Sequence, residues 1–286
     1  MDRIELKHVT FSYTLAENKA LDDVSFTFEK GRFYGVIGEN GGGKTTLYNL
    51  LRGLIPNFFK GEMSGQVLYD GTDMKDLDVD ALSVDIGYVF QNPFTQISGV
   101  KKTVFEEVAL GLENLGVPPE EIVKRVIDVL KLLEIERLAL NNPTELSGGQ
   151  RQRVAFASII VMDPDILVID EPTSQLDPEG SRRIFDIIEM LKKRNKTIVL
   201  VEHKINMIAR YCDEVLVMKD GKLVRSGSAQ EVLADASLPS LGVRLPEAAQ
   251  LAYDLADEGL PMPGTPITDE DCCRMIQERW GIHGGN

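Results

Sequence analysis

The stretch that decides the fold reads Gly38-Glu39-Asn40-Gly41-Gly42-Gly43-Lys44-Thr45-Thr46. It fits the phosphate-binding pattern G-x-x-x-x-G-K-[ST], and it lies between an apolar run at 34–37 and a helical pattern of leucines that begins at Leu47. Glycines let backbone N–H groups wrap an anion, and the N-terminus of the following helix faces the same anion. We therefore expect Lys44 to reach the terminal phosphates of a nucleotide and Thr45 to offer its hydroxyl to Mg²⁺. The alternative is a glycine-rich loop that fits the pattern by chance.

Composition limits the classes of partner. The 286 residues are 43% hydrophobic, which is enough for one large domain or two modest ones with ordinary cores. Asp and Glu number 45 against 31 Lys and Arg, so the net charge is −14. A chain of this charge is poorly suited to grip a polyanion over a broad surface. We expect no nucleic-acid partner, and a nucleotide must be held by local features.

Compartment is indicated by apolar runs and cysteines. No apolar run approaches the roughly 18 residues of a membrane span, and the N-terminal residues do not open a signal peptide. The expected location is the cytosol unless a partner recruits the chain. Cys212, Cys272 and Cys273 have no C-x-x-C spacing, which favours a reduced compartment. No ligand spacing supports a metal site at the adjacent pair, and we place both cysteines in a C-terminal helix.

The N-terminal segment has the pattern of a sheet. Apolar residues nearly alternate from Ile4 to Phe11 and from Val24 to Phe28, which predicts half-buried strands of an antiparallel sheet. Tyr13 is expected in the turn after the first strand. An aromatic ring just before a nucleotide fold can stack on a base, which is worth about 1–3 kcal/mol for nucleic-acid bases. Packing in the core is an equally good interpretation of Tyr13.

Three further apolar runs are predicted to be strands that end in polar side chains. They are 86–93 with Gln91, 165–172 with Asp170 and Glu171, and 197–203 with His203. Apolar β-branched runs are typical of parallel strands buried on both faces, and open α/β sheets bind ligands at the carboxyl ends of their strands. Adjacent acids point in different directions, so one can serve Mg²⁺ while the other faces the attacking water. The alternative is that both acids merely cap the next segment.

A helical segment separates the first two of these strands. Helical periodicity runs from Thr103 to Leu133, with a break at Pro118-Pro119. It leads to Leu146-Ser147-Gly148-Gly149-Gln150, in which Ser147 and Gln150 have capping-box spacing. The glycines leave this helix N-terminus open to an anion. A plain capped helix is the alternative, although two glycines are costly there unless something approaches closely.

The remaining segments carry no catalytic pattern. A short strand is predicted at 65–71, and a hairpin at 215–224 with an Asp-Gly turn at Asp220 and Gly221. Beyond Gly227 the pattern changes to short helical pieces interrupted by prolines. We expect this tail to serve an interaction.

Taken together, the motifs resemble those of the ATP-binding subunits of ABC transporters, over about residues 4–227. The counterparts in chain order are Tyr13 (adenine-stacking aromatic), 38–46 (Walker A), Gln91 (Q-loop), 146–150 (LSGGQ signature), Asp170 and Glu171 (Walker B and catalytic glutamate), 174–177 (D-loop) and His203 (switch histidine). Two residues depart from the family pattern. Gly42 stands where Ser is frequent, and Gln175 replaces the usual Ala of the D-loop. Neither departure removes a catalytic group.

The resemblance implies an α/β fold. Its parts are a P-loop NTPase (RecA-like) core, an N-terminal antiparallel β subdomain, an inserted ABC helical subdomain and a small C-terminal helical extension. The ATPase domain is expected at 1–227 with the helical insert at about 92–160. Residues 228–286 form the extension, which is a candidate dimerisation element.

The resemblance also implies an ATPase coupled to transmembrane transport, with ATP and Mg²⁺ as cofactors. The catalytic residues implied are Lys44, Gln91, the general base Glu171, and His203 at the γ-phosphate. The Mg²⁺ ligands implied are Thr45, Gln91 and Asp170, the last directly or through water. The ATP-binding residues implied are Tyr13, Gly38, Glu39, Asn40, Gly41, Gly42, Gly43, Lys44, Thr45 and Thr46. In a head-to-tail dimer the residues that act in trans are Ser147, Gly148, Gly149 and Gln150, beside Asp177 of the D-loop.

A finer resemblance is to the energy-coupling factor (ECF), CbiO-like branch. It depends on residues 88–93 and 103–116 and on the tail to Asp271. This branch implies import of a micronutrient such as a vitamin or a transition-metal ion. The implied partners are a second ABC ATPase subunit, identical or paralogous, a transmembrane coupling protein and a separate membrane substrate-binding subunit. The implied location is peripheral, at the cytoplasmic face of the cell membrane.

Two other functions share the ATPase motifs. One is the ATPase of another ABC importer or exporter, which differs only in its partner. The other is a soluble ABC ATPase of DNA repair or translation. Such chains commonly carry two ATPase units or long coiled coils, and the net charge of −14 disfavours this class further.

Overall fold

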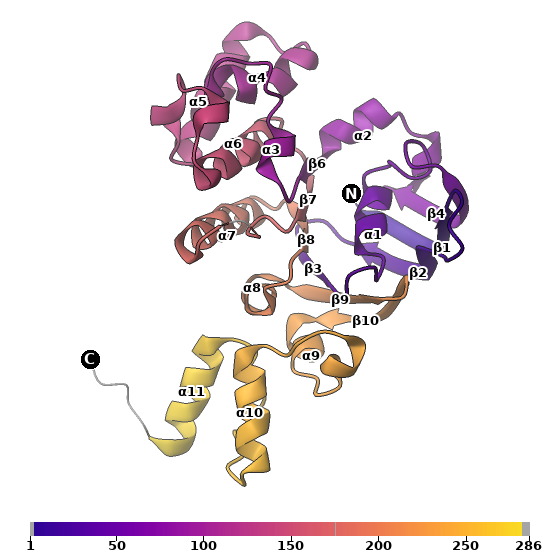
Figure 1. Cartoon of the computed structure of the whole chain (residues 1–286), viewed down its shortest axis with the longest axis vertical. Helices are drawn as coiled ribbons and strands as arrows, with labels where there is room; N and C mark the ends of the chain where they lie inside the picture. The colour runs from indigo at the N-terminus through magenta and orange to yellow at the C-terminus, as the bar shows by residue number, and fades with distance from the viewer. Residues whose placement is uncertain (1–2, 175, 282–286) are drawn as a thin grey trace.

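A computed structural model describes residues 3–174 and 176–281, so Gln175 of the D-loop lies outside the described residues. The chain folds into two sheets with helices around them (Figure 1). The strands are β1 (Ile4–Tyr13), β2 (Leu21–Phe28), β3 (Phe33–Ile37), β4 (Gly61–Tyr69), β5 (Thr72–Asp73), β6 (Ile86–Val89), β7 (Ile166–Asp170), β8 (Thr197–Val201), β9 (Glu214–Lys219) and β10 (Lys222–Ser228).

The α-helices alternate with the strands and then extend beyond them. They are α1 (Lys44–Leu51), α2 (Val79–Asp85), α3 (Pro93–Gln96), α4 (Val104–Asn114), α5 (Pro119–Leu132), α6 (Gly148–Ile160), α7 (Pro178–Lys193), α8 (Ile205–Tyr211), α9 (Ala229–Leu233), α10 (Glu247–Asp257) and α11 (Asp269–Trp280). Short 3₁₀ helices are η1 (Met74–Asp76), η2 (Glu136–Leu138), η3 (Pro143–Glu145) and η4 (Leu238–Leu241).

The smaller sheet has the order β2-β1-β4-β5, and its neighbours pair antiparallel, which confirms the antiparallel sheet predicted for the N-terminal segment. The predicted position of Tyr13 is wrong, because Tyr13 is the last residue of β1 and pairs with Gly61 of β4. Strand β4 also begins earlier than the strand predicted at 65–71. Strand β4 pairs with β1 as far as Tyr13, past a register shift between Lys7 and Thr10 of β1. This pairing with a distant segment extends β4 back to Gly61.

The larger sheet has the order β10-β9-β3-β8-β7-β6, and all neighbours except β10 and β9 pair parallel. The three polar-tipped strands predicted from the sequence are therefore parallel neighbours. In this register Asp170 at the end of β7 lies beside Val201 at the end of β8. The carboxyl ends of β3, β7 and β8 thus meet at one edge, where the phosphate loop begins.

Both faces of this sheet are buried. Alternate residues of β3 and β8 belong to two hydrophobic clusters: Phe33 and Ile198 contribute to one, and Tyr34 and Val199 contribute to the other. The first cluster also contains residues of α4–α7, and the second joins the smaller sheet to α1. Burial on both faces explains why these strands are apolar without alternation.

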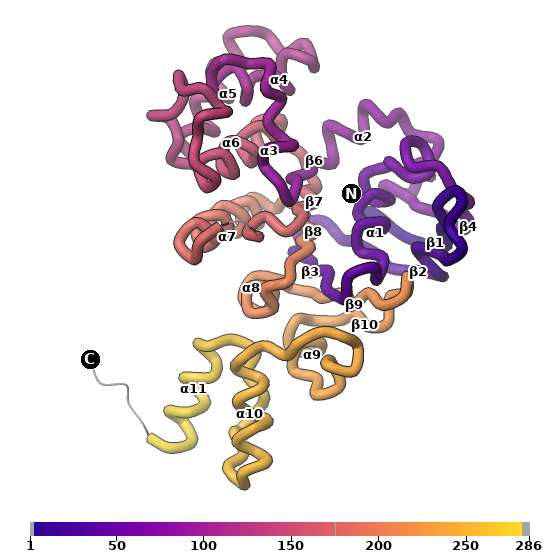
Figure 2. Tube along the Cα trace, viewed as in Figure 1, coloured from indigo at the N-terminus to yellow at the C-terminus, as the bar shows by residue number. Residues whose placement is uncertain are grey.

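The helical insert leaves the larger sheet after β6 and returns to it at β7, as the tube in Figure 2 follows. Helix α4 packs on both α5 and α6, and α6 packs on β6. A Cβ atom on Gly87 of β6 would lie only 2.6 Å from Cγ2 of Ile159 in α6, so this glycine permits the close approach of the helix. The insert is therefore fixed to the sheet next to the strand that leads to Gln91.

The C-terminal segment begins inside the core and then projects from it. Leu233, Leu238 and Val243 are buried in the same cluster as the larger sheet. Helices α10 and α11 then extend away from the sheets (Figure 1). Helix α11 carries Cys272, which is buried, and Cys273, which is exposed, and this confirms their placement in a helix. None of the helices in the described part of the chain is both long enough and apolar enough to cross a membrane.

Candidate functional site

The phosphate loop between β3 and α1 depends on backbone shapes that favour glycine. Gly38, Gly41 and Gly43 have φ of 142°, 81° and 102°. A Cβ atom on Gly38 would lie 2.0 Å from the carbonyl oxygen of Met218, so this position has no room for a side chain. Gly43 is the N-cap of α1 and provides no capping side chain. The first N–H groups of α1 are thereby left for an anion.

A cavity of about 340 Å³ lies at the carboxyl edge of the sheet beside this loop. It brings together most of the predicted nucleotide and metal residues from four separate segments. Its lining residues are Tyr13, Ala20, Asn40, Gly41, Gly43, Lys44, Thr45, Thr46, Tyr48, Gln91, Asp170, Glu171 and Val201. Of the other predicted ATP-binding residues, Gly38, Glu39 and Gly42 lie in the loop but do not line this cavity.

Lys44 points back over the loop. Its Nζ donates hydrogen bonds to the carbonyl oxygens of Gly38 at 2.7 Å and Glu39 at 2.9 Å. Burial lowers the pKa of the Lys44 ammonium, and the Glu171 and Asp170 carboxylates oppose that shift. The loop carbonyls therefore hold a largely desolvated cation at the cavity, where a phosphate group can compete for it.

Glu171 is the meeting point of two other segments. Gln91 Nε2 donates to Glu171 Oε2 at 2.6 Å, and His203 Nε2 lies 2.8 Å from Glu171 Oε1. The Glu171 backbone has a φ of 39°, an uncommon value for a residue with a side chain, and its N–H donates to the Val201 carbonyl at 2.8 Å. The structure thus places Gln91, Glu171 and His203 in one contact group, and His203 reaches the cavity through Glu171.

Asp170 is held by a residue that sequence reasoning missed. The Tyr88 hydroxyl donates to Asp170 Oδ2 at 3.0 Å. Burial raises the pKa of Tyr88 above its usual range, and the negative charge of Asp170 adds to this shift, so the hydroxyl keeps its proton. Tyr88 lies in β6 among apolar residues and looks like a core residue in the sequence. The only signal was its position three residues before Gln91.

Glu202 was also missed, although it lies between the predicted strand and His203. The residue is only 4% exposed. It accepts hydrogen bonds from the Thr173 hydroxyl at 2.9 Å and from the backbone N–H groups of His203 and Lys204 at 2.9 and 3.2 Å. Lys204 Nζ in turn donates to the Thr173 carbonyl at 3.1 Å. Glu202 therefore ties the segment after Glu171 to the segment that carries His203.

Tyr13 packs on other aromatic residues, and it also lies beside the cavity, where stacking on a base stays a prediction. Its ring is T-shaped against Phe11 and Phe59, with centroid separations of 4.9 and 6.3 Å. Its hydroxyl lies 3.1 Å from Thr46 Oγ1, and the residue lines the cavity. The half-buried ring therefore packs on aromatic neighbours while the residue borders the cavity at Lys44.

The signature segment forms the predicted capping box at the start of α6. Ser147 Oγ accepts from the Gln150 N–H at 3.4 Å, and Gln150 Oε1 accepts from the Ser147 N–H at 3.1 Å. A Cβ atom on Gly148 would meet nothing within 4 Å, so no close packing in the described chain explains this glycine.

A second cavity, of about 250 Å³, contains the signature residues Ser147, Gly149 and Gln150 together with Asp177. Asp177 caps α7 by accepting from the Gly180 N–H at 2.7 Å. Arg153 and Arg183 also line this cavity, a feature that sequence reasoning missed, and Arg183 is ion-paired there with Glu179. It shares no lining residue with the cavity at Lys44. The signature residues and the phosphate loop thus line two separate cavities.

Comparison with known proteins identifies the family of this chain. A sequence profile described as "ABC transporter" matches residues 21–174. The chain belongs to the ABC transporter family. The energy-coupling factor transporter ATP-binding protein EcfA1 of Caldanaerobacter subterraneus is 40% identical to this ABC ATPase over 96% of this chain and 98% of that protein. EcfA of Enterococcus faecium is 37% identical over 97% and 96%.

Solved structures agree with this assignment. The structure of cbiO1 from Clostridium perfringens, described as part of the ABC transporter complex cbiONQ, covers 88% of this chain and all of that chain with a TM-score of 0.75 and 32% identity. A dimeric ATP-binding cassette in a post-hydrolysis state, bound to ADP and phosphate, covers 79% and 98% with a TM-score of 0.68 and 34% identity. The chain is an ECF/CbiO-like ABC ATPase, in which ATP hydrolysis is coupled to transport.

The donor set of the ABC ATPase fits a magnesium-bound nucleotide. Thr45, Gln91 and Asp170 offer a hydroxyl, an amide oxygen and a carboxylate around one cavity. In residues 3–174 and 176–281, no group of three or more His, Cys, Asp or Glu side chains is arranged to hold a metal alone. A Mg²⁺ ion at Thr45 and Asp170 would need phosphate oxygens to complete its shell, which is how this ion commonly binds with nucleotides.

Arg151 of the ABC ATPase binds the backbone just before Ser147 of the signature. It is buried, and its guanidinium donates to the carbonyl oxygens of Thr144 at 2.7 Å and Leu146 at 3.0 Å. The same group lies 3.7 Å from the ring centroid of Phe94 in α3. Arg151 therefore connects the segment before Ser147 with the helix that follows Gln91.

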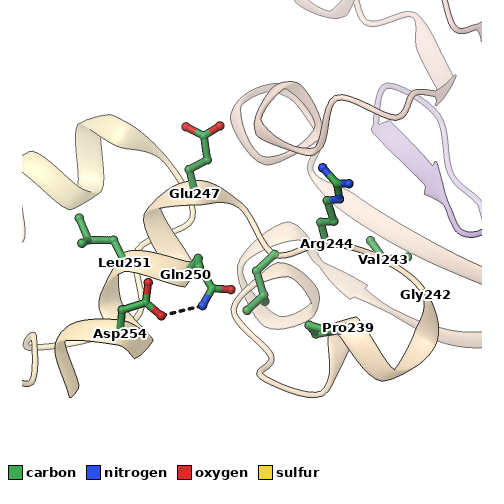
Figure 3. A pocket seen from close by; sticks show the side chains of 9 residues that line it. Pro239, Gly242, Val243, Arg244, Glu247, Gln250, Leu251 and Asp254 are labelled. Atoms are coloured by element: carbon green, nitrogen blue, oxygen red, sulfur yellow. Dashed lines mark hydrogen bonds between the residues drawn. The ribbon is translucent and has the colours of Figure 1, made fainter. Parts of the chain in front are cut away.

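The C-terminal extension of the ABC ATPase has a cavity of its own, of about 540 Å³ (Figure 3). Val243, Arg244 and Glu247 are among its lining residues, and Gln250 Nε2 donates to Asp254 Oδ1 at 2.8 Å on α10. The extension also touches the phosphate loop. A Cβ atom on Gly242 would lie 2.0 Å from Oε1 of Glu39, so the Glu39 side chain rests against this glycine.

Proposed function

We propose that this ABC ATPase is the motor subunit of an ECF-type importer for a micronutrient such as a vitamin or a transition-metal ion. The observation that carries the proposal is the convergence of Gln91, Asp170 and Glu171 on the cavity that contains Lys44 and Thr45. The ECF assignment is supported by relatives that match almost the whole chain, tail included. A general ATP-binding site without transport would not account for that similarity.

Within the site, we assign the residues by the atoms that they present. Lys44 and the loop residues 38–46 hold the β- and γ-phosphates. Glu171 is the general base for the attacking water, and Gln91 and His203 hold its two carboxylate oxygens. His203 also contacts the γ-phosphate in this proposal, and Tyr13 stacks on the adenine.

Mg²⁺ would be held by Thr45, Asp170 and the side-chain oxygen of Gln91. Since Nε2 of Gln91 donates to Glu171, Oε1 is the atom left for the ion. When bound, the ion neutralises developing charge on the phosphates. The protein side chains orient the nucleotide and the water around that charge.

We further propose a head-to-tail dimer in which Ser147, Gly148, Gly149 and Gln150 of one chain complete the nucleotide site of the other, beside Asp177. Two features support this arrangement. The signature cavity is separate from the Lys44 cavity within one chain, and Gly148 has open space around it. The partner is a second copy or a paralogous ATPase.

The remaining partners are a transmembrane coupling protein and a separate membrane substrate-binding subunit. The chain then acts as a peripheral protein at the cytoplasmic face of the cell membrane. The cbiO1 structure supports this because its description places that protein in a complex with other components. The transported solute is bound by the other subunits in this proposal.

The test is to tag the chain in its native cell, solubilise the membranes in mild detergent and identify the proteins that co-purify. We expect a small transmembrane coupling protein, an ATPase partner and a solute-binding membrane subunit whose identity names the cargo. Recovery of an unrelated permease would retain the motor and contradict the ECF assignment. A pool bound only to ribosomes or DNA would contradict transport itself.

The dimerisation role of residues 228–286 needs a truncation that keeps most of the core. Removal of everything after Gly227 would delete Leu233, Leu238 and Val243 and open the hydrophobic cluster of the ATPase. A chain that ends at Leu245 keeps these three residues and removes α10 and α11, and of the cluster it loses Ile267 alone. If the extension dimerises, light scattering without nucleotide will show a smaller mass for this shortened chain than for the full chain, by more than the mass of the residues removed. A mass that falls only by the residues removed would contradict the role.

A further inference from the structure

Strand β6 and the residues directly after it contact both acidic residues of the site. Tyr88 Oη donates to Asp170 Oδ2 at 3.0 Å, and Gln91 Nε2 donates to Glu171 Oε2 at 2.6 Å. The two donors come from one short segment, and the two acceptors are adjacent in the chain. The segment that holds the proposed general base therefore also holds the neighbouring carboxylate.

Tyr88 is fixed tightly enough to orient that carboxylate. The residue is only 8% exposed. The Arg52 guanidinium lies 3.6 Å from its ring centroid, the Tyr48 ring lies tilted at 5.6 Å, and the Phe90 ring stands edge-on at 4.6 Å. Arg52 and Tyr48 belong to the helix that follows the phosphate loop and to its C-terminal cap. The ring is thus packed between the phosphate-loop helix with its cap and Phe90, the residue directly after β6.

The hydrogen bond leaves the two oxygens of Asp170 in different situations. Oδ2 accepts the hydrogen bond from Tyr88, which leaves Oδ1 as the other oxygen. The residue itself lines the same cavity as Thr45. A carboxylate held at one oxygen by a fixed donor presents its other oxygen in a defined direction, and such outer partners commonly tune metal affinity.

We propose that Tyr88 is a positioning residue: its ring is held by Arg52 and Tyr48, and its hydroxyl holds Oδ2 of Asp170, which leaves Oδ1 for Mg²⁺. This inference rests on the proposed function, because that function assigns Asp170 to the ion. Tyr88 touches neither nucleotide nor ion and acts through Asp170. If Tyr88 served core packing alone, it would contribute to folding stability and would not affect the affinity for Mg²⁺.

The test is Tyr88→Phe, which removes the hydroxyl and keeps the ring. Binding of a fluorescent ribose-labelled ATP is measured in EDTA and over a Mg²⁺ titration. We expect the half-saturating Mg²⁺ concentration to rise about tenfold, as is typical when an outer hydrogen bond to a metal ligand is lost. The dissociation constant in EDTA should stay within about twofold, because no nucleotide contact has changed.

The matched control is Tyr69→Phe. Tyr69 in β4 makes the same kind of bond, from its hydroxyl to Asp85 Oδ2 at 3.3 Å, but neither residue lines the nucleotide cavity. This variant should leave the Mg²⁺ titration unchanged. A shift of equal size in both variants would show a general loss of structure and overturn the proposal.

Asp170→Asn separates this inference from the proposed function. If Asp170→Asn raises the Mg²⁺ requirement and Tyr88→Phe does not, the positioning role is wrong and the proposed function stands. If Asp170→Asn leaves the requirement unchanged, the assignment of Asp170 to Mg²⁺ is wrong, and the positioning role falls with it. Weaker binding of Tyr88→Phe in EDTA by the same factor as in Mg²⁺ would also overturn the inference.

Discussion

His203 Nε2 lies 2.8 Å from Oε1 of Glu171, so the ends of β7 and β8 are joined by a direct contact between the proposed general base and the switch histidine. Because β7 and β8 are adjacent and parallel, the two side chains leave the sheet at the same edge. The contact makes the orientation of one side chain depend on the other. It also makes the two residues a natural pair for mutational analysis.

Glu171→Gln should bind ATP with near-normal affinity and hydrolyse it 10²–10⁴-fold more slowly, which is the usual loss when a general base is removed. The ATP-bound variant should accumulate as a dimer, visible by size-exclusion chromatography with light scattering. Glu120→Gln, on the exposed start of α5, is the matched control and should retain full turnover. Near-normal turnover of Glu171→Gln would rule out the general-base role.

The contact between Glu171 and His203 predicts non-additive effects on turnover. His203→Ala alone should slow hydrolysis, because Glu171 loses one of the two groups that orient it. The double variant Glu171→Gln with His203→Ala should be hardly slower than Glu171→Gln, since both changes disable the same unit. Multiplication of the two single effects in steady-state assays would show that the residues act independently.

Two glycines of the phosphate loop should respond very differently to alanine. Gly38 and Gly41 both have positive φ, but only Gly38 has an atom, the Met218 oxygen, where a Cβ would lie. Gly41→Ala should lower the free energy of unfolding by about 1–2 kcal/mol, and Gly38→Ala by more than about 3 kcal/mol because overpacking adds to the backbone strain. Urea unfolding without nucleotide measures both. Equal losses would show that the crowding at Met218 is relieved without cost.

Glu202 should matter for stability more than its position beside His203 suggests. Glu202→Ala leaves the buried Thr173 hydroxyl and two partly buried backbone N–H groups without their acceptor. At about 1–3 kcal/mol for each unsatisfied group, we expect a loss of at least about 3 kcal/mol in urea unfolding. Glu202→Gln keeps one accepting oxygen and should lose clearly less. An unchanged midpoint for Glu202→Ala would contradict this network.

Cys212 predicts a pH dependence with a defined sign. Burial raises the pKa of its thiol well above the usual 9.0 in the folded chain. Above about pH 9 the unfolded thiol loses its proton while the folded thiol keeps it, so the folded state binds more protons and the free energy of unfolding falls as pH rises. Below that pH the contribution is fully present. The slope attributable to Cys212 cannot exceed about 1.4 kcal/mol per pH unit.

The check is to compare the native chain with Cys212→Ala by urea unfolding at several pH values from about 8 to 10. The stability difference between the two should shrink as pH rises. Iodoacetamide provides a second measurement, because Cys273 is exposed and should react in the folded state, whereas Cys212 should react only on unfolding. Parallel pH profiles would contradict the raised pKa.

The sequence was sufficient for features whose signal is local. Apolar runs predicted β7 and β8, and their parallel pairing then placed Asp170, Glu171 and His203 at one edge. The capping box at Ser147 was predictable because both of its hydrogen bonds join residues three apart. The Asp220-Gly221 turn was predictable because both residues adopt positive φ, as this dipeptide favours in a two-residue hairpin.

Features that depend on distant partners were not predictable. Tyr13 stayed in β1 because Gly61 pairs with it across the sheet. Tyr88 contacts Asp170 and Glu202 contacts Thr173, and both contacts depend on the order of the strands in the sheet. The prolines of the tail indicated a separate segment, yet Leu238 and Val243 complete the core, because burial is decided by what lies beside a residue in space.

Helix α6 connects the signature residue Ser147 with strand β6, so a tilt of this helix would displace Ser147. Its 13 residues give a length of about 20 Å, with capped Ser147 at one end and Ile159 seated against Gly87 near the other. If the helix tilts by about 10° around that seat, Ser147 moves by about 3 Å, on the scale of a hydrogen bond made or broken. The strand that forms the fulcrum is β6, which carries Tyr88 and leads to Gln91. A small rotation beside the cavity at Lys44 is therefore geometrically sufficient to move the signature residues by about the length of a hydrogen bond.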